Sequence, residues 1–471
     1  MKKFFWLLPI ALPLLLVLAR QDSSAQDIKG IITETGRVAI ALPDLRGSGA
    51  AQNWMQAFND TLWGDISSSG VVKMVPKTMY PTTVPQQPSD FREPPPPTPE
   101  PTRGRRHKQT ELVTPPTGGG LWISDWSGPP VNANYLAFGY TAVQNDVLVL
   151  SGWLYDLSRG TPANAQVLGK RYLASVDEAG ARRVAHEFAA DILMLLGGKS
   201  LYGTRIVFVS NRTAAHNKEI WMMDPDGSNQ RQITHYNSLS IEPAISPDGS
   251  KIAFASYAKG NPGIFIFSVD PVRQLPFYNQ RASVNETPEF TPDGKQILYS
   301  SSASGWAQIY IANLDGSGLK RLSSSAAIEV EPKVNPKTGT EIAFVSGRSG
   351  PQQIYRMNID GGDVERLTNG EGEASNPSWN PDGVHLAFSW TRGFAAGNWN
   401  IFVMDVASRN LVQLTHSEGR NENPSWAPDG VHIVFQSTRS GTPQIYSMLA
   451  DGTQVKQLTT QGSNWSPVWG K

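Results

Sequence analysis

The sequence predicts a mainly β protein in which a six-bladed β-propeller follows a small α/β domain. A proline-marked turn recurs at Pro247, Pro292, Pro336, Pro381 and Pro428, in steps of 45, 44, 45 and 47 residues. Each turn is followed by an apolar strand, and the C-terminal residues resemble the one strand that the first repeat lacks. Four short strands repeated at this period are typical of propeller blades.

The repeated turn, written SPDG at Ser246, has the chemistry of a hairpin turn. Proline fixes φ at its second position, aspartate accepts hydrogen bonds from the turn backbone, and glycine adopts the positive φ that follows. The strand after the turn is β-branched or aromatic, as in IAFAS from Ile252. We therefore interpret these prolines, aspartates and glycines as structural rather than catalytic.

Ring closure is predicted from the two ends of the repeat region. The apolar strand occurs six times, starting at Ile206, Ile252, Ile297, Ile342, Leu386 and Ile433. A second proline precedes each turn at Pro243, Pro288, Pro332, Pro377 and Pro424, but the first copy lacks it. Pro467 and Trp469 align with Pro424 and Trp426, so the C-terminus is expected to complete the first blade and remove free sheet edges.

The N-terminal part alternates strand and helix patterns. Strands are predicted at residues 36–42 and 71–75 and from Asn134, Asp146 and Ala165, with amphipathic helices over 49–70 and 177–198. A proline-rich insertion at 81–118 interrupts this domain and includes a basic run at 103–108. Its composition is expected to pack no core and to stay solvated.

The first residues have the anatomy of a secretory signal peptide. Lys2 and Lys3 precede an apolar stretch at 4–18, and small residues at 23–25 favour cleavage after Ala25. The alternative is a membrane anchor, which the short run and Pro9 and Pro13 disfavour. We therefore divide the chain into a signal peptide (1–25), an N-terminal domain (26–198) and a propeller (199–471), and expect a periplasmic protein.

Composition and motifs offer little to support an enzyme. Lys+Arg and Asp+Glu both number 41, so no net charge attracts nucleic acid, and the absence of cysteine excludes thiolate chemistry. There is no G-x-S-x-G motif, and His186 lacks the second histidine of H-E-x-x-H. His385 and His432 share a repeat position with Lys251, which predicts exposed strand-start residues. We expect no catalytic residue, cofactor or metal.

A candidate binding surface lies on the loops at one end of the predicted ring. Polar, charged and aromatic residues that converge on a concave mouth suit recognition of a protein or an oligosaccharide. The candidates are Arg212, His235, Glu242, Glu286, Trp306, Glu331, Arg348, Asn376, Arg392, His416, Glu422 and Arg439. Glu-x-Pro and Asn-x-Pro pieces could equally brace one blade against the next, and the sequence leaves both readings open.

The repeat S/N/T-P-D-G-x-x-I/L-A-F-x-S, followed by I-Y-x-M-x-x-D-G and x-L-T, resembles the PD40, WD40-like propeller repeat. With a signal peptide and a small α/β domain before it, the chain resembles the TolB family of the Tol-Pal system. That resemblance implies a periplasmic adaptor that binds a Pal-like peptidoglycan-associated lipoprotein through its propeller. It also implies a TolA-like inner-membrane partner for the N-terminal segment and a role in outer-membrane integrity and constriction at division.

The resemblance implies outer-membrane lipoproteins or porins as further partners and only peripheral membrane association. Two departures limit it: the insertion at 81–118 is foreign to the family pattern, and residues 26–36 carry no motif that identifies a TolA contact. Two alternatives stay open. One is a propeller that binds glycans or peptidoglycan fragments, favoured by rim tryptophans, and the other is a propeller lyase or hydrolase with a dispersed metal site.

Overall fold

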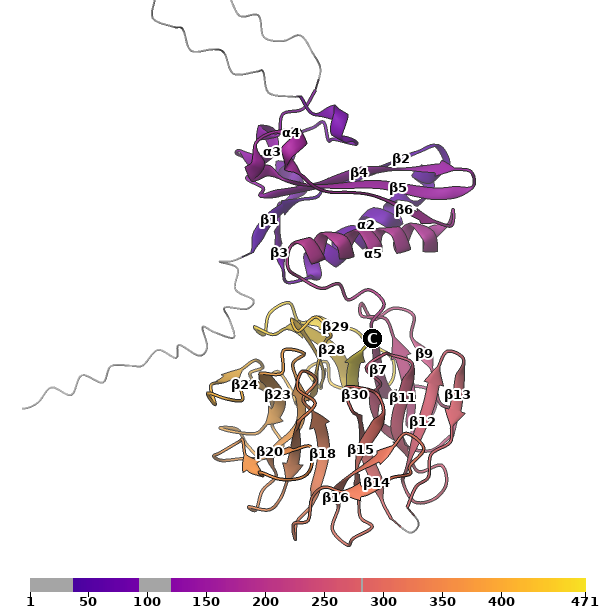
Figure 1. Cartoon of the computed structure of the whole chain (residues 1–471), viewed down its shortest axis with the longest axis vertical. Helices are drawn as coiled ribbons and strands as arrows, with labels where there is room; N and C mark the ends of the chain where they lie inside the picture. Colours follow the sequence, from indigo (N-terminus) through magenta and orange to yellow (C-terminus); the bar gives the residue numbers. More distant parts are fainter. Residues whose placement is uncertain (1–36, 93–119, 281–282) are drawn as a thin grey trace, which may run out of the picture.

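The computed structural model describes residues 37–92, 120–280 and 283–471, which form an α/β sheet domain above one end of a β-propeller (Figure 1). The predicted signal peptide, the segment at 26–36 and most of the proline-rich insertion lie outside these residues. In the part of the chain that is described, no helix combines the length and the apolar character needed to cross a membrane.

The N-terminal domain is a mixed sheet covered by two helices on one face. Its strands are β1 (Val38–Ala41), β2 (Arg46–Ser48), β3 (Val72–Met74), β4 (Tyr135–Gln144), β5 (Val147–Asp156) and β6 (Gln166–Ala174). They are ordered β3-β1-β4-β5-β6, with β2 also paired to β4. The covering helices are α2 (Met55–Ser68) and α5 (Glu178–Leu195), and the short helices α3 (Ser124–Ser127) and α4 (Pro162–Ala165) lie beyond the sheet's other face.

The amphipathic pattern of the sequence explains how the helices pack. Phe58 and Leu62 of α2 and Phe188 of α5 are buried against the sheet. Asp177 begins α5 by accepting a hydrogen bond from the backbone NH of Gly180, and Gly197 follows its end at a φ of +83°. This helix was predicted with nearly the same limits.

The prediction that the proline-rich segment packs no core is wrong for its first residues. Phe91 is only 7% exposed and contacts Phe138 and Tyr155, each with ring centroids 5.5 Å apart. Phe91 also pairs with Leu121 in an isolated β-bridge, so described residues from the two sides of segment 93–119 lie together. The average composition of residues 81–118 did not indicate the burial of Phe91, because burial of a single ring needs only a local apolar surface.

The propeller consists of six four-stranded antiparallel blades. Blade 1 is β30 (Asn464–Gly470), β7 (Arg205–Ser210), β8 (Glu219–Met223) and β9 (Arg231–Gln232); blade 2 is β10 (Ser240–Ile245), β11 (Lys251–Ser256), β12 (Gly263–Val269) and β13 (Val272–Leu275); blade 3 is β14 (Asn285–Phe290), β15 (Gln296–Ser301), β16 (Gln308–Asn313) and β17 (Lys320–Arg321). Blade 4 is β18 (Glu329–Val334), β19 (Glu341–Ser346), β20 (Gln353–Asn358) and β21 (Glu365–Arg366); blade 5 is β22 (Ala374–Trp379), β23 (His385–Trp390), β24 (Asn400–Asp405) and β25 (Leu411–Gln413); blade 6 is β26 (Asn421–Trp426), β27 (His432–Ser437), β28 (Gln444–Leu449) and β29 (Lys456–Gln457).

Ring closure is confirmed. The C-terminal strand β30 pairs with β7, and Trp469 lies opposite Ile206 just as Trp426 lies opposite Ile433 in blade 6. The chain therefore begins and ends the propeller in one sheet, which leaves no unpaired inner strand.

Strand direction assigns the loops of each blade to two ends of the ring. The PDG-type turns and the turns between third and fourth strands lie at one end, and the N-terminal domain packs there. Gly70, just after α2, approaches Val431 and Leu449 so closely that a Cβ at this glycine would lie 2.9 Å from Val431. The loops that carry the predicted binding residues lie at the opposite end, called the rim below.

Candidate functional site: the propeller channel and rim

Six residues of identical backbone conformation form a ring around the propeller channel. Each immediately precedes the repeating proline of an inner strand, and each has φ between 47° and 55°. The ring consists of Glu242, Thr287, Glu331, Asn376, Asn423 and Ser466. A register shift in the pairing of the first and second strands coincides with this position in every blade. The bulge turns these side chains toward the channel.

The channel is a cavity of about 260 Å³ lined by all six ring residues. Its other lining residues include Glu289, Lys333, Trp379, Trp426 and Trp469. Carboxylates from blades 2, 3 and 4 therefore face one part of the channel wall, and tryptophans from blades 5, 6 and 1 face another. A partner group that enters meets both charge and aromatic surface.

Hydrogen bonds connect the ring from blade to blade. The backbone NH of Thr287 donates to Glu242 at 2.8 Å, and the backbone NH of Asn376 donates to Glu331 at 2.5 Å. Asn423 donates through its side-chain amide to the Ser466 hydroxyl at 2.9 Å. These contacts are interblade braces, and the same side chains line the channel.

Burial and like charge raise the pKa of the channel carboxyls. Desolvation, the neighbouring Glu286 and Glu331 raise the pKa of Glu242 from an ordinary 4.5 to about 7. Desolvation also raises the pKa of Glu331. Glu289 has a raised pKa from burial, although Lys333 contacts it at 2.7 Å. Glu242 and Glu331 have no cationic partner within 4 Å among the described residues.

Glu242→Gln is expected to change the pH dependence of stability. The folded protein binds a proton at Glu242 more tightly than the unfolded chain, so the free energy of unfolding falls as pH rises from about 4.5 to about 7. The glutamine variant should lack that decline, so its free energy of unfolding at pH 8 should exceed that of the wild type by about 2 kcal/mol. Urea unfolding between pH 4.5 and 8 measures this. Glu422→Gln, at the rim, is the control and should follow the wild-type profile.

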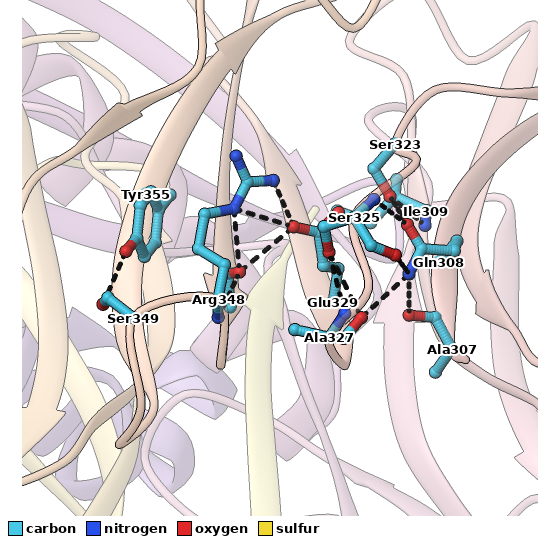
Figure 2. Close-up of polar contacts among 11 residues, drawn as sticks. Ala307, Gln308, Ile309, Ser323, Ser325, Ala327, Glu329, Arg348, Ser349 and Tyr355 are labelled. Atoms are coloured by element: carbon cyan, nitrogen blue, oxygen red, sulfur yellow. Dashed lines mark hydrogen bonds and ion pairs between the residues drawn. The ribbon is translucent and has the colours of Figure 1, made fainter.

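Three predicted rim arginines are engaged inside their own blades. Arg348 forms an ion pair with Glu329 (Figure 2). Its guanidinium also lies over the Phe344 and Tyr355 rings. Equivalent contacts join Arg212 to Asn464 at 2.9 Å and Arg439 to Asn421 at 3.0 Å. In each case the guanidinium also bonds the serine that ends the second strand.

The Glu329 carboxylate is the one acidic group among the buried partners of these three arginines. Its side chain has no exposed surface, and one oxygen accepts hydrogen bonds from Arg348 and from the Ser346 hydroxyl at 3.1 Å. The other oxygen has no hydrogen-bond partner in the described structure. Beside it, Gln308 donates to backbone carbonyls of the loop before β18, including Ala327 at 2.8 Å (Figure 2).

The remaining predicted rim residues are divided between paired and exposed side chains. Glu286 accepts a hydrogen bond from the Tyr257 hydroxyl at 2.8 Å, and Glu422 contacts Arg420 at 2.7 Å. The exposed residues are His235, His416, Arg392 and Trp306. The Arg392 guanidinium lies over the Trp390 ring, and Trp306 is 57% exposed. The structure thus brings Glu242, Glu331 and Asn376 together in the channel and leaves the others around its mouth.

Sequence reasoning missed half of the ring and all three channel tryptophans from the candidate set. Thr287 and Ser466 were not among the candidates. The candidates Glu286 and Glu422 each immediately precede a ring residue in the sequence. The signal was present in the sequence, because the residue before each repeating proline occupies the ring. Selection by charge and aromatic character did not reveal it, since threonine and serine have neither.

The prediction that His385 and His432 are exposed is wrong. Both are buried. The aspartate of the preceding turn accepts a hydrogen bond at 2.6 Å from the Nδ1 atom of each ring. His186 likewise contacts Asp65 across the two helices at 2.6 Å. No group of three or more histidine, aspartate or glutamate side chains with metal-binding geometry occurs in the described ranges.

Comparisons with known proteins agree with this architecture. Residues 193–393 and 367–471 match the family described as TolB beta propeller domain. A TolB homolog of Chlorobaculum tepidum is 39% identical over 140 residues, 30% of each chain, and a Tol-Pal system protein TolB of Roseobacter denitrificans is 33% identical over 168 residues. The latter match covers 35% of this chain and 36% of the relative, so the chain matches about a third of these relatives' length.

A solved structure extends the likeness to both domains. The crystal structure of TolB from Acinetobacter baumannii covers 92% of this chain and 96% of its own, with a TM-score of 0.72. Sequence identity is 20%, so this match establishes the common fold.

Proposed function

The chain belongs to the TolB β-propeller family, and from this premise we propose that it is a non-catalytic periplasmic adaptor of a Tol-Pal system. Its propeller would bind a Pal-like lipoprotein, and its N-terminal region a TolA-like inner-membrane protein. In this role it would maintain outer-membrane integrity and assist constriction at division. The observation that carries the proposal is the channel with its ring of six inward-facing residues.

The chemistry of the channel defines what its partner would present. Glu242 and Glu331 have no cationic group within 4 Å among the described residues, although the Lys333 charge acts on both from farther away. Lys333 and Arg348 are already paired with Glu289 and Glu329 within the propeller. A partner loop with a basic side chain would therefore complement the channel. Such complementarity accelerates association and selects partners, and it weakens as salt rises.

Calorimetric titration with the soluble domain of the same organism's Pal-like lipoprotein tests the proposal. We expect one-to-one binding that weakens roughly tenfold or more in the Glu242→Gln/Glu331→Gln variant, because the complementary charges are lost. Asp360→Asn/Asp363→Asn removes the same two negative charges from an exposed turn at the other end and should leave affinity unchanged. Absence of heat with a folded partner would contradict the adaptor function, and an equal loss for both variants would contradict the location.

We also propose that the N-terminal segment influences the propeller site. Residues 26–35 precede the first described strand, and the family resemblance assigns a TolA contact to this segment. Removal of residues 26–35 should then change propeller affinity for the lipoprotein in the same titration. An unchanged affinity would show that the two contacts are independent.

A second candidate function rests on Trp306. An indole that is 57% exposed beside the mouth of a concave site can stack on a sugar ring. A peptidoglycan-fragment titration that gives binding lost in Trp306→Ala, together with no lipoprotein binding, would favour this alternative.

A further inference from the structure

His432 lies where the propeller meets the N-terminal domain. It is the first residue of β27, and its two ring nitrogens face two oxygens from different domains. The Nδ1 atom is 2.6 Å from the Asp429 carboxylate on its own turn, and the Nε2 atom is 2.8 Å from the backbone carbonyl of Ser68. Ser68 is the last residue of α2, so this contact joins a helix end to a propeller turn.

Both oxygens are hydrogen-bond acceptors, and this determines the protonation that the contact needs. Asp429 already accepts from the backbone NH groups of Val431 and His432. The Ser68 carbonyl is among the last four of α2, which have no donor inside the helix, and a positive charge there is favourable. A neutral imidazole has one proton, so it could satisfy one acceptor and would turn a lone pair toward the other.

We propose that His432 is a pH-sensitive latch that docks the N-terminal domain on blade 6. The imidazolium closes the latch by donating to both oxygens. Loss of one of its two ring protons leaves a single N–H for two acceptors, which removes one hydrogen bond and weakens docking. This property goes beyond the adaptor function and does not depend on any partner.

The other groups near the contact do not share the position of His432 between two acceptors. Gly70 packs against Val431 without charge. Arg37 and Asp451 approach across the domains at 3.8 Å, and arginine and aspartate ordinarily keep their charge between pH 5 and 8. His186 on α5 is a second histidine near the contact, but it pairs with Asp65 of its own domain and stacks on Tyr202 of the linker. It therefore requires its own variant.

The repeat provides a matched control for the latch. His385 occupies the same position in blade 5 and makes the same 2.6 Å contact with its turn aspartate, Asp382. Within the described residues its ring makes no hydrogen bond to the N-terminal domain. His385→Gln therefore perturbs an equivalent turn without touching the domain contact. His432→Lys introduces the residue type found at the equivalent position of blade 2, Lys251. A lysine side chain is ordinarily charged up to about pH 10.

Pulsed dipolar spectroscopy on the full chain tests the latch. Ala163 and Ala396 are exposed in the two domains, and because the chain has no cysteine, Ala163→Cys and Ala396→Cys accept spin labels specifically. We expect one narrow interdomain distance at pH 5.5 and a broader distribution at pH 8.5, as one charge-assisted hydrogen bond corresponds to roughly a tenfold shift in docking.

The variants decide whether His432 is responsible. His432→Gln and His432→Lys should abolish the pH response, the lysine variant with the narrow distance at both pH values. His385→Gln and His186→Gln should retain the wild-type response. Identical wild-type distributions at the two pH values would overturn the proposal, as would a normal response in both His432 variants or a response lost in His186→Gln. Urea unfolding midpoints at pH 5.5 confirm that each variant is folded.

Discussion

Trp469→Ala is expected to lower the free energy of unfolding by about 3–5 kcal/mol, the usual loss for truncation of a buried tryptophan. Trp469 is 6% exposed and packs at the junction where the C-terminal strand closes blade 1. Its indole NH donates to the Thr204 hydroxyl at 3.0 Å, so the substitution also leaves a buried hydroxyl without this partner. Because the closing strand joins the two ends of the propeller, the loss should destabilise the ring as a whole.

Urea unfolding followed by tryptophan fluorescence measures this effect. Trp465→Ala is the matched control, since it removes the same side chain from the same strand at a partly exposed position where Lys218 lies over the ring. We expect a loss of about 1 kcal/mol for that variant. Equal losses for the two substitutions would show that closure does not depend on the packing of Trp469.

Arg348→Ala should have the second large effect, a loss of about 3 kcal/mol in the free energy of unfolding. The substitution leaves the Glu329 carboxylate buried without its cation, and an uncompensated buried charge costs far more than an exposed ion pair contributes. Arg348 is itself partly exposed, at 28% for its side chain, which keeps the expected loss at the lower end of the range.

A double-mutant cycle separates the charge from lost packing. Adding Glu329→Ala to Arg348→Ala should recover part of the stability, because the buried charge is then removed. Arg392→Ala is the control: that exposed guanidinium contacts only the Trp390 ring among its described contacts, and a loss of about 0.5 kcal/mol is expected. If the double variant is less stable than Arg348→Ala by the full cost of Glu329→Ala alone, the two residues do not interact.

These stability effects bear on how partner-binding variants are chosen. Arg348 was a candidate for partner contact in the sequence, but its role in holding Glu329 means that an affinity loss in Arg348→Ala could report unfolding. Channel carboxylates such as Glu331 are better probes, since their replacement by glutamine preserves volume and keeps one of the two hydrogen bonds that Asn376 donates. The structure therefore moves the test of function from the arginines to the channel.

The local parts of the fold were predictable because their causes are local. Gly249 in the turn has a φ of +72°, and Asp248 accepts from the backbone NH of Ser250, as the turn chemistry requires. The pairing of Trp469 with Ile206 followed from alignment of one repeat with another. By contrast, Phe91 was missed because its packing partners, Phe138 and Tyr155, are 47 or more positions away in the sequence.

The sequence by itself determined the six blades, their closure by the C-terminus, and the helices and most of the strands of the N-terminal domain. The blades, helices and strands depend on periodic apolar residues and turn residues within about 45 positions, and closure followed from comparison of the C-terminal repeat with the others. Only the tertiary structure decided which polar side chains are available. Arg348 faces a buried carboxylate, Glu242 faces a channel, and His432 meets Ser68, 364 residues away. Burial and charge pairing depend on residues that only folding brings together, so no local pattern could specify them.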